Sequence, residues 1–263
     1  MDVFNWIRYF KSNRGSYTEP DWSAPRALPA GRQLELLRSS LATFQLGETG
    51  EGSTLQRYAR RLADERRFDG YDEALRLFVD EEKMHAQLLA QTLGYLGGDL
   101  IHRQWTNSVF RRARRLINLE FEIQIFVTAE IIGRAYYSLL YRHVDDPVVK
   151  SVCGKLVSDE VKHLNFHIEF FRARLGHLPR FRRRLWQLQF EAIFAAARQA
   201  VWLDHRPCLR AFGVSRSEFM LSTARGLRSL LLRLHSTQTL VPSVVPAIGR
   251  PALDQVSTLI TGR

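Results

Sequence analysis

Apolar residues recur at helical spacing along most of this chain, and no stretch shows the strict alternation of a half-buried strand. The first 30 residues are the exception: glycine and proline interrupt any period, so we expect an irregular N-terminus. The tail from Ser236 onward is also expected to be irregular. Helices are expected over residues 32–67, 69–97, 108–142, 147–175, 180–203 and 215–235. The predicted fold class is therefore all-α.

Several of these helices have recognisable ends or bends. The first is expected to bend where Gly47, Gly50 and Gly52 cluster. The glycine pair at 97–98 suits the end of the second, and Asp146 followed by Pro147 suits the start of the fourth. The third is apolar nearly all round, which predicts that it is buried on most sides. Because no stretch requires a linker, we expect residues 1–263 to form a single domain, with the helices of residues 180–235 packed onto the rest.

Composition narrows the class of protein. The chain carries a net charge of +11, mostly from arginine, which could attract nucleic acid, anionic lipid or acidic small molecules, although a solvated basic face is the simpler interpretation. We therefore expect no firm nucleic-acid or membrane partner. The two cysteines are far apart, which argues against a disulfide framework and fits a reducing compartment. Without a signal peptide or a long apolar run, the expected location is cytoplasmic.

Two Glu-x-x-His pairs are the strongest candidates for chemistry. They are Glu82 with His85 and Glu160 with His163, and a lone Glu precedes each pair by about thirty residues. Residues three apart share one helical face, so each pair can reach one metal ion. The upstream acid is Glu130 in the second half of the chain. In the first half it is Glu51 or Glu48, and the equal spacing of the two halves favours Glu51.

Four carboxylates and two imidazoles suit two iron or manganese ions better than a thiolate-seeking metal. Glu130 supports this interpretation, because an unpaired acid inside so apolar a helix is costly and a metal would remove the cost. The alternative is a bundle without metal, in which a cation such as Arg134 neutralises the buried acids.

Residues next to the expected ligands can orient them. Asp159 and Asp80 are candidates to accept the distal N–H of a coordinating imidazole, and Asp159 is the better one. His167, one turn after His163, is an additional ligand, a hydrogen-bond donor outside the metal shell, or a buried, hydrogen-bonded histidine.

The doubled Glu…Glu-x-x-His pattern resembles the ferritin-like superfamily of carboxylate-bridged di-iron or di-manganese proteins. Within it, the chain resembles the oxygenase and oxidase branch, which is related to ribonucleotide reductase small subunits, amine N-oxygenases and aldehyde-deformylating oxygenases. The resemblance covers about residues 35–175 and implies a four-helix bundle with additional C-terminal helices. It departs from the amine N-oxygenases at Leu156, where those proteins carry a third histidine.

The resemblance implies a di-iron (or Mn/Fe) oxidoreductase that uses dioxygen to oxidise or oxygenate a small organic or lipid-like substrate. Such a reaction would need an electron donor, for example a reductase or a ferredoxin. The chain could also form a homodimer. Two alternatives are a ferroxidase or iron-handling protein and a hydroxylase of tRNA bases. Storage in a cage fits poorly with a basic chain and a long helical extension, and base hydroxylation is suggested only by the net charge.

Overall fold

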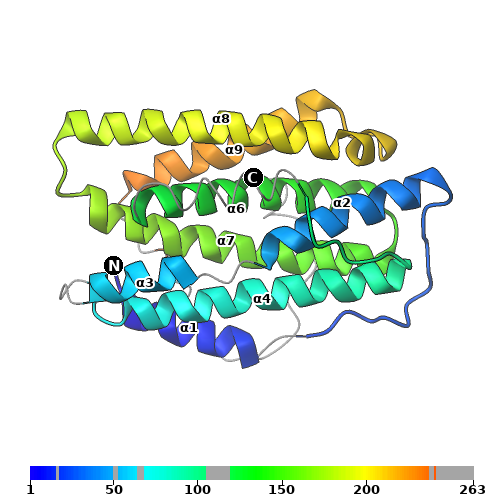
Figure 1. Ribbon diagram of the computed structural model, residues 1–263, viewed down its shortest axis with the longest axis horizontal. Coiled ribbons are helices and arrows are strands. Elements are labelled where there is room, and N and C mark those ends of the chain that lie inside the picture. The colour runs from blue at the N-terminus through cyan, green and yellow to red at the C-terminus, as the bar shows by residue number, and fades with distance from the viewer. Residues whose placement is uncertain (16–17, 50–52, 64–67, 105–118, 237–239, 241–263) are drawn as a thin grey trace.

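The computed structural model describes the chain apart from residues 16–17, 50–52, 64–67, 105–118, 237–239 and 241–263. All regular elements in the described ranges are helices, which confirms the all-α class (Figure 1). They are α1 (Val3–Gly15), α2 (Arg32–Glu48), α3 (Ser53–Ala63), α4 (Tyr71–Leu96), α6 (Leu119–His143), α7 (Pro147–Leu175), α8 (Arg180–Ala211) and α9 (Arg216–Leu234).

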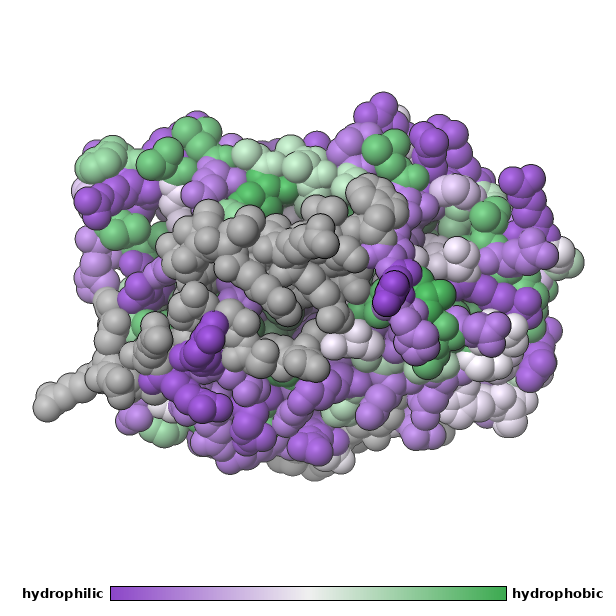
Figure 2. All heavy atoms as spheres, viewed as in Figure 1, coloured by the Kyte–Doolittle hydropathy of each residue, from purple (hydrophilic) through white to green (hydrophobic). Residues whose placement is uncertain are grey.

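The long helices lie side by side in layers (Figure 1). Helices α6 and α7 form the middle layer and pack against each other. Helix α4 contacts α7 from one side and also contacts α1, α2 and α3, while α8 and α9 cover α6 from the other side. The interior between α4, α6 and α7 is therefore closed on both sides. In the same view, hydrophobic and hydrophilic side chains are interspersed over the surface (Figure 2).

Two helix ends that the sequence predicted are confirmed, whereas the expected end at residue 67 and start at residue 108 lie outside the described residues. The Asp146 carboxylate accepts hydrogen bonds from the backbone N–H groups of Val148 (3.1 Å) and Val149 (3.0 Å), with Pro147 in the first turn. At the end of α4, Gly97 takes a left-handed φ of 71°, and the N–H of Gly98 donates to the carbonyl of Leu93 at 2.8 Å. Where one helix over residues 32–67 was expected, the structure describes two, α2 ending at Glu48 and α3 beginning at Ser53, and the expected bend at Gly50 and Gly52 lies outside the described residues.

The expectation of an irregular N-terminus is wrong for α1. Its four buried side chains, Val3, Trp6, Ile7 and Phe10, follow helical spacing and pack into the core. The prolines that suggested irregularity all lie after this helix. Of the expected irregular tail, only Ser236 and Leu240 lie within the described residues.

Helix α8 is longer than expected and continues through Pro207 to Ala211. His205, Cys208 and Leu209 on this extension are buried, so packing onto the bundle favours the helix despite the proline.

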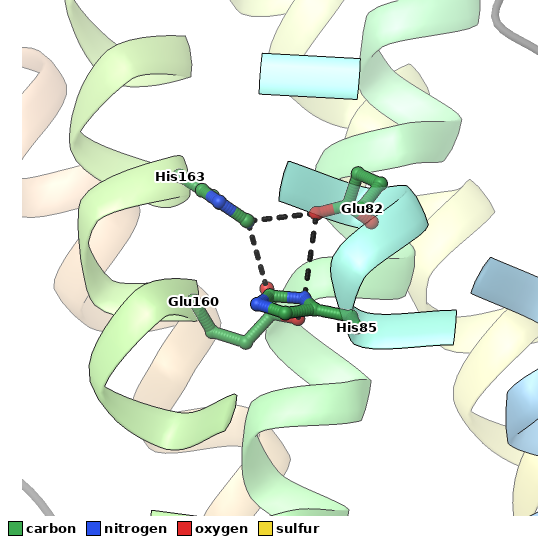
Figure 3. A group of neighbouring side chains, drawn as sticks. All are labelled: Glu82, His85, Glu160 and His163. Atoms are coloured by element: carbon green, nitrogen blue, oxygen red, sulfur yellow. Dashed lines mark ion pairs between the residues drawn. The ribbon is translucent and has the colours of Figure 1, made fainter. Parts of the chain in front are cut away.

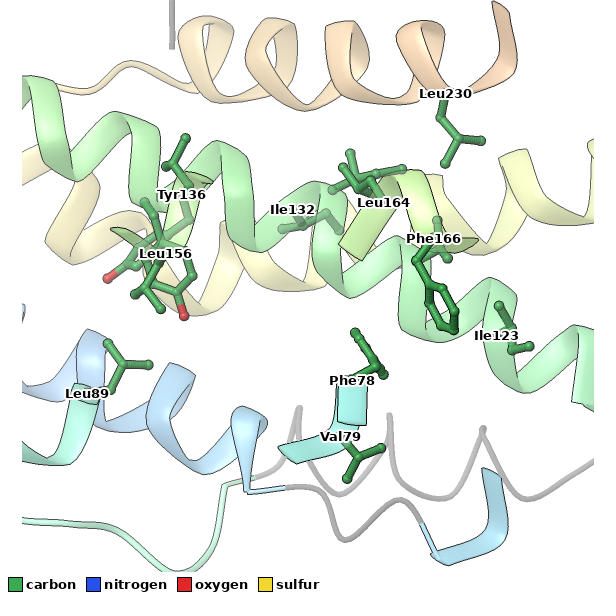
Figure 4. Packing of buried hydrophobic residues seen from close by; sticks show 14 of the residues in the cluster. Phe78, Val79, Leu89, Ile123, Ile132, Tyr136, Leu156, Leu164, Phe166 and Leu230 are labelled. Atoms are coloured by element: carbon green, nitrogen blue, oxygen red, sulfur yellow. The ribbon is translucent and has the colours of Figure 1, made fainter. Parts of the chain in front are cut away.

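The core is one cluster of buried hydrophobic residues to which every described helix contributes. Figure 4 shows part of it: Phe78 and Leu89 of α4 lie toward Leu156 and Phe166 of α7. Leu156, the residue at the histidine position of the amine N-oxygenases, is fully buried in this apolar cluster. Among the described helices, none combines the length and the apolar composition that crossing a membrane requires.

Candidate metal centre

The two Glu-x-x-His pairs meet between α4 and α7. Glu82 and His85 project from α4 toward Glu160 and His163 on α7, as Figure 3 shows. One ligand atom from each of the four side chains lies within 4.8 Å of the others, and all four residues are buried. The structure thus brings together the halves of a motif that lie far apart in the sequence, in a cluster that could hold metal ions.

The imidazole nitrogens face the carboxylates at short range. Nδ1 of His163 lies 2.8 Å from Oε1 of Glu82, and Nδ1 of His85 lies 3.7 Å from the same oxygen. Nδ1 of His85 is also 3.9 Å from Oε1 of Glu160, so the four groups surround one small space (Figure 3).

Glu130 reaches the same space from α6. Its Oε2 lies 3.4 Å from Nδ1 of His163, and the residue is 4% exposed. The acid that stood out in the sequence because of its apolar surroundings therefore joins the cluster and does not point to solvent.

Five atoms that point into this space have no hydrogen-bond partner among the described residues. They are Oε1 of Glu82, Nδ1 of His85, Oε2 of Glu130, Oε2 of Glu160 and Nδ1 of His163. Even the 2.8 Å contact between His163 and Glu82 lacks hydrogen-bond geometry. Buried polar atoms are normally satisfied, so five converging exceptions require another partner. Three carboxylate oxygens and two imidazole nitrogens are a donor set that fits iron or manganese.

The outer nitrogen of each histidine is held by an acid on the opposite helix. Nε2 of His85 lies 3.0 Å from Oδ2 of Asp159, which also accepts from Lys155, and Nε2 of His163 lies 2.9 Å from Oε2 of Glu81. These contacts occupy Nε2 of each ring, so Nδ1 is the nitrogen that faces the carboxylates and could bind a metal ion. Asp159 thus contacts the histidine of the other half, as expected, while coordination by that histidine stays a prediction. Asp80, the weaker candidate, instead pairs with Arg76 and Lys83 near the surface.

Glu81 also belongs to this cluster, although the sequence analysis did not single it out. It precedes Glu82 as Asp159 precedes Glu160, so each half of the chain carries an acidic pair followed by histidine. This parallel was the signal that could have identified it. Helix α1 supports Glu81 from outside, because Nδ2 of Asn13 donates to its Oε1 at 2.7 Å.

The acids of the cluster perturb one another strongly. Burial, reinforced by the charge of Glu130, raises the pKa of Glu160 well above its usual value. For Glu82 burial acts in the same direction, but His163, His85 and a hydrogen bond with Glu48 together outweigh it and lower the pKa to about 2. Conversely, the carboxylates of Glu82 and Glu130 outweigh burial and raise the pKa of His163. So many ionisable groups in one buried space favour a bound cation.

Glu48 lies at the edge of the cluster. Burial and the charge of the adjacent Glu82 raise its pKa well above the usual value, and the hydroxyl of Tyr137 donates to its Oε1 at 2.9 Å. Glu51, which the spacing favoured as the first ligand, lies outside the described residues.

His167 is fully buried and packs edge-on against Phe78, with ring centroids 4.8 Å apart. Neither of its ring nitrogens has a hydrogen-bond partner among the described residues. Burial and the charge of His163 lower its pKa to about 3, so the ring is neutral. His167 was expected to be an additional ligand, an outer hydrogen-bond donor or a buried, hydrogen-bonded histidine. The structure shows it buried, but without a hydrogen bond among the described residues.

Aromatic rings close the space on the α1 side. Phe78, one turn before Glu82, meets the ring of His163 edge-on at 4.8 Å, and Phe10 of α1 lies 6.4 Å from the same ring. These side chains limit access of water and the rotation of His163.

Comparisons with known proteins return no match: no model of a protein family fits the sequence, and neither the curated proteins nor the solved structures contain a significant match.

Proposed function

We propose that this protein is a ferritin-like oxidoreductase that binds two metal ions, two irons or a manganese–iron pair, and activates dioxygen to oxidise a small organic or lipid-like substrate. The observation that carries the proposal is the convergence of five unsatisfied buried donor atoms from three helices. The bundle would consist of α4, α6, α7 and the segment that carries α2 and α3.

The metal-holding residues in this proposal are Glu82, His85, Glu130, Glu160 and His163, with Glu48 or Glu51 as the sixth. Four carboxylates offset the charge of two divalent ions, so the loaded site is close to neutral. This balance explains how four acids are accommodated in an apolar interior. A lone arginine explains it less well: Arg134 interacts with Glu160, but the guanidinium supplies only one positive charge.

The bound metal ions would supply the redox chemistry with dioxygen, and an external reductase or ferredoxin would supply electrons. The chain itself would do three things. The carboxylates would hold the ions, Asp159 and Glu81 would orient the two imidazoles with Nδ1 toward them, and Phe78 would pack against His163 and limit the entry of water.

The test is to load the protein anaerobically with ferrous iron and mix it with dioxygen in a stopped-flow spectrometer. We expect a transient absorption band in the visible region. His85→Ala should abolish the band because it removes one imidazole from the cluster. His177→Ala, at an exposed histidine beyond α7, should leave it unchanged. A protein that holds two irons per chain and shows no optical change would contradict the proposed activity.

A further inference from the structure

The first half of α8 exposes large apolar side chains in a row. Phe181, Leu185 and Leu188 are 68%, 64% and 46% exposed. Their spacing of four and three residues places them on one face of the helix. Figure 2 shows hydrophobic side chains among hydrophilic ones along the edge of the molecule that α8 forms in Figure 1. Soluble surfaces expose single apolar residues routinely, but a contiguous row indicates contact with a partner.

Three exposed arginines flank this row: Arg180, Arg182 and Arg184. The sequence from residue 176 to residue 190 contains neither Asp nor Glu, and the first acid along the helix is Glu191. None of the three arginines forms an ion pair with another described residue. The Arg182 guanidinium instead lies 5.9 Å from the ring centre of Phe181. The result is an apolar strip inside a cationic border.

The opposite face of α8 is firmly anchored. Phe190 and Phe194 are buried, and the ring of Trp186 packs edge-on against Phe171 of α7 at 4.9 Å. The exposed row is therefore presented on a fixed helix and cannot turn inward to bury itself.

We propose that this face of α8, the row of Phe181, Leu185 and Leu188 with its arginine border, docks on an anionic membrane surface. Apolar side chains of a basic amphipathic helix enter the boundary between headgroups and acyl chains, and arginines bind anionic headgroups. This inference is independent of the proposed metal chemistry.

The charge and shape of the face favour a membrane over the two other partners. A second copy of the chain placed on the same face would bring two arginine clusters together. A nucleic acid would satisfy the arginines but leave Leu185 and Leu188 against phosphates and water. An anionic bilayer satisfies both the charges and the apolar row.

The test is co-sedimentation of the full-length protein with vesicles of phosphatidylcholine, alone or mixed with phosphatidylglycerol. We expect binding to the mixed vesicles that weakens with added salt. Leu185→Glu should weaken it about ten-fold or more, because a buried leucine is lost and a like charge is added. Arg184→Gln should weaken it about five-fold, the usual contribution of one cation near an anionic leaflet. Leu221→Glu on α9, at a leucine that is 53% exposed, is the matched control and should bind as the unchanged protein does.

Circular dichroism checks that both variants are folded. If they are, the proposal would be overturned by absence of binding to the mixed vesicles, or by an equal loss of vesicle binding in Leu185→Glu and Leu221→Glu. Two further results would also overturn it. One is a dimer in the absence of lipid that Leu185→Glu dissociates. The other is salt-dependent RNA binding that displaces the protein from vesicles and is insensitive to Leu185→Glu. Metal content should be the same in all these variants. A negative result for membrane binding is therefore distinguishable from a negative result for the proposed metal function.

Discussion

Nε2 of His163 on α7 lies 2.9 Å from Oε2 of Glu81 on α4. The reverse contact joins His85 on α4 to Asp159 on α7 at 3.0 Å. Each half of the site is therefore oriented by the acid that precedes the other half's glutamate. The two Glu-x-x-His pairs form one reciprocal unit, and neither helix can present its imidazole correctly alone.

Glu81→Gln should weaken metal binding by about 10- to 100-fold, the usual effect of removing the group that orients a ligating imidazole. The glutamine keeps the size of the side chain and one acceptor oxygen, but it loses the negative charge that strengthens the hydrogen bond from Nε2 of His163. Competition with a chelator of known affinity measures the change. Asp80→Asn, one residue earlier and paired at the surface, is the control. Equal affinities for the two variants would show that Glu81 does not support the site.

Glu48→Gln should reduce metal occupancy more than Glu51→Gln, because Glu48 adjoins Glu82 and accepts from Tyr137. Elemental analysis of both variants decides between the two candidates. If only Glu51→Gln lost metal, the spacing in the sequence would have identified the first ligand correctly and Glu48 would be a neighbour of the site.

Phe78→Ala should destabilise the fold by about 3–5 kcal/mol, the usual cost of truncating a buried phenylalanine. Phe78 is fully buried and packs against His163 and His167. Urea unfolding of the metal-free protein measures the change. Phe4→Ala, at a phenylalanine that is 61% exposed, should change stability little. Similar losses in both variants would contradict the packing described here.

Gly226→Ala should destabilise the protein by about 1–3 kcal/mol through overpacking. A Cβ at position 226 of α9 would come within 2.7 Å of Cγ2 of Ile131, the neighbour of Glu130 on α6. Gly94→Ala in α4 has open space around its Cβ and should be neutral or stabilising by up to about 1 kcal/mol. Thermal unfolding compares them, and a stabilising Gly226→Ala would show that α9 does not approach α6 this closely.

Local signals predicted much of the fold. Asp146 with Pro147 marked the start of α7, and Gly97 marked the end of α4, because capping depends on residues close in the sequence. Helix α1 was not predicted, although Trp6, Ile7 and Phe10 follow helical spacing. The prolines between residues 20 and 29 indicate irregular structure only for the segment after this helix. The length of α8 depends on burial against the bundle, which the sequence around Pro207 does not reveal.

The site was predictable where chemistry depends on spacing within one helix. Glu82 with His85 and Glu160 with His163 converge as expected. Contacts between helices were harder to predict from the sequence. Asp159 was identified as a partner of a histidine. The contact of Glu81 with His163 depends on how α4 packs against α7, and the contact of Tyr137 with Glu48 depends on how α6 packs against α2. A sequence gives the face on which a side chain lies, but not the partner that it meets across the bundle.

Elemental analysis of the purified protein, with Glu130→Ala beside it, tests the central claim most directly. Glu35→Ala, at an exposed acid on α2, is the control for loss of a carboxylate. We predict two iron or manganese ions per chain in the unchanged protein and in Glu35→Ala, and loss of metal in Glu130→Ala. Absence of metal from the protein after loading with iron and manganese, or full occupancy in Glu130→Ala, would contradict a metal centre between α4, α6 and α7.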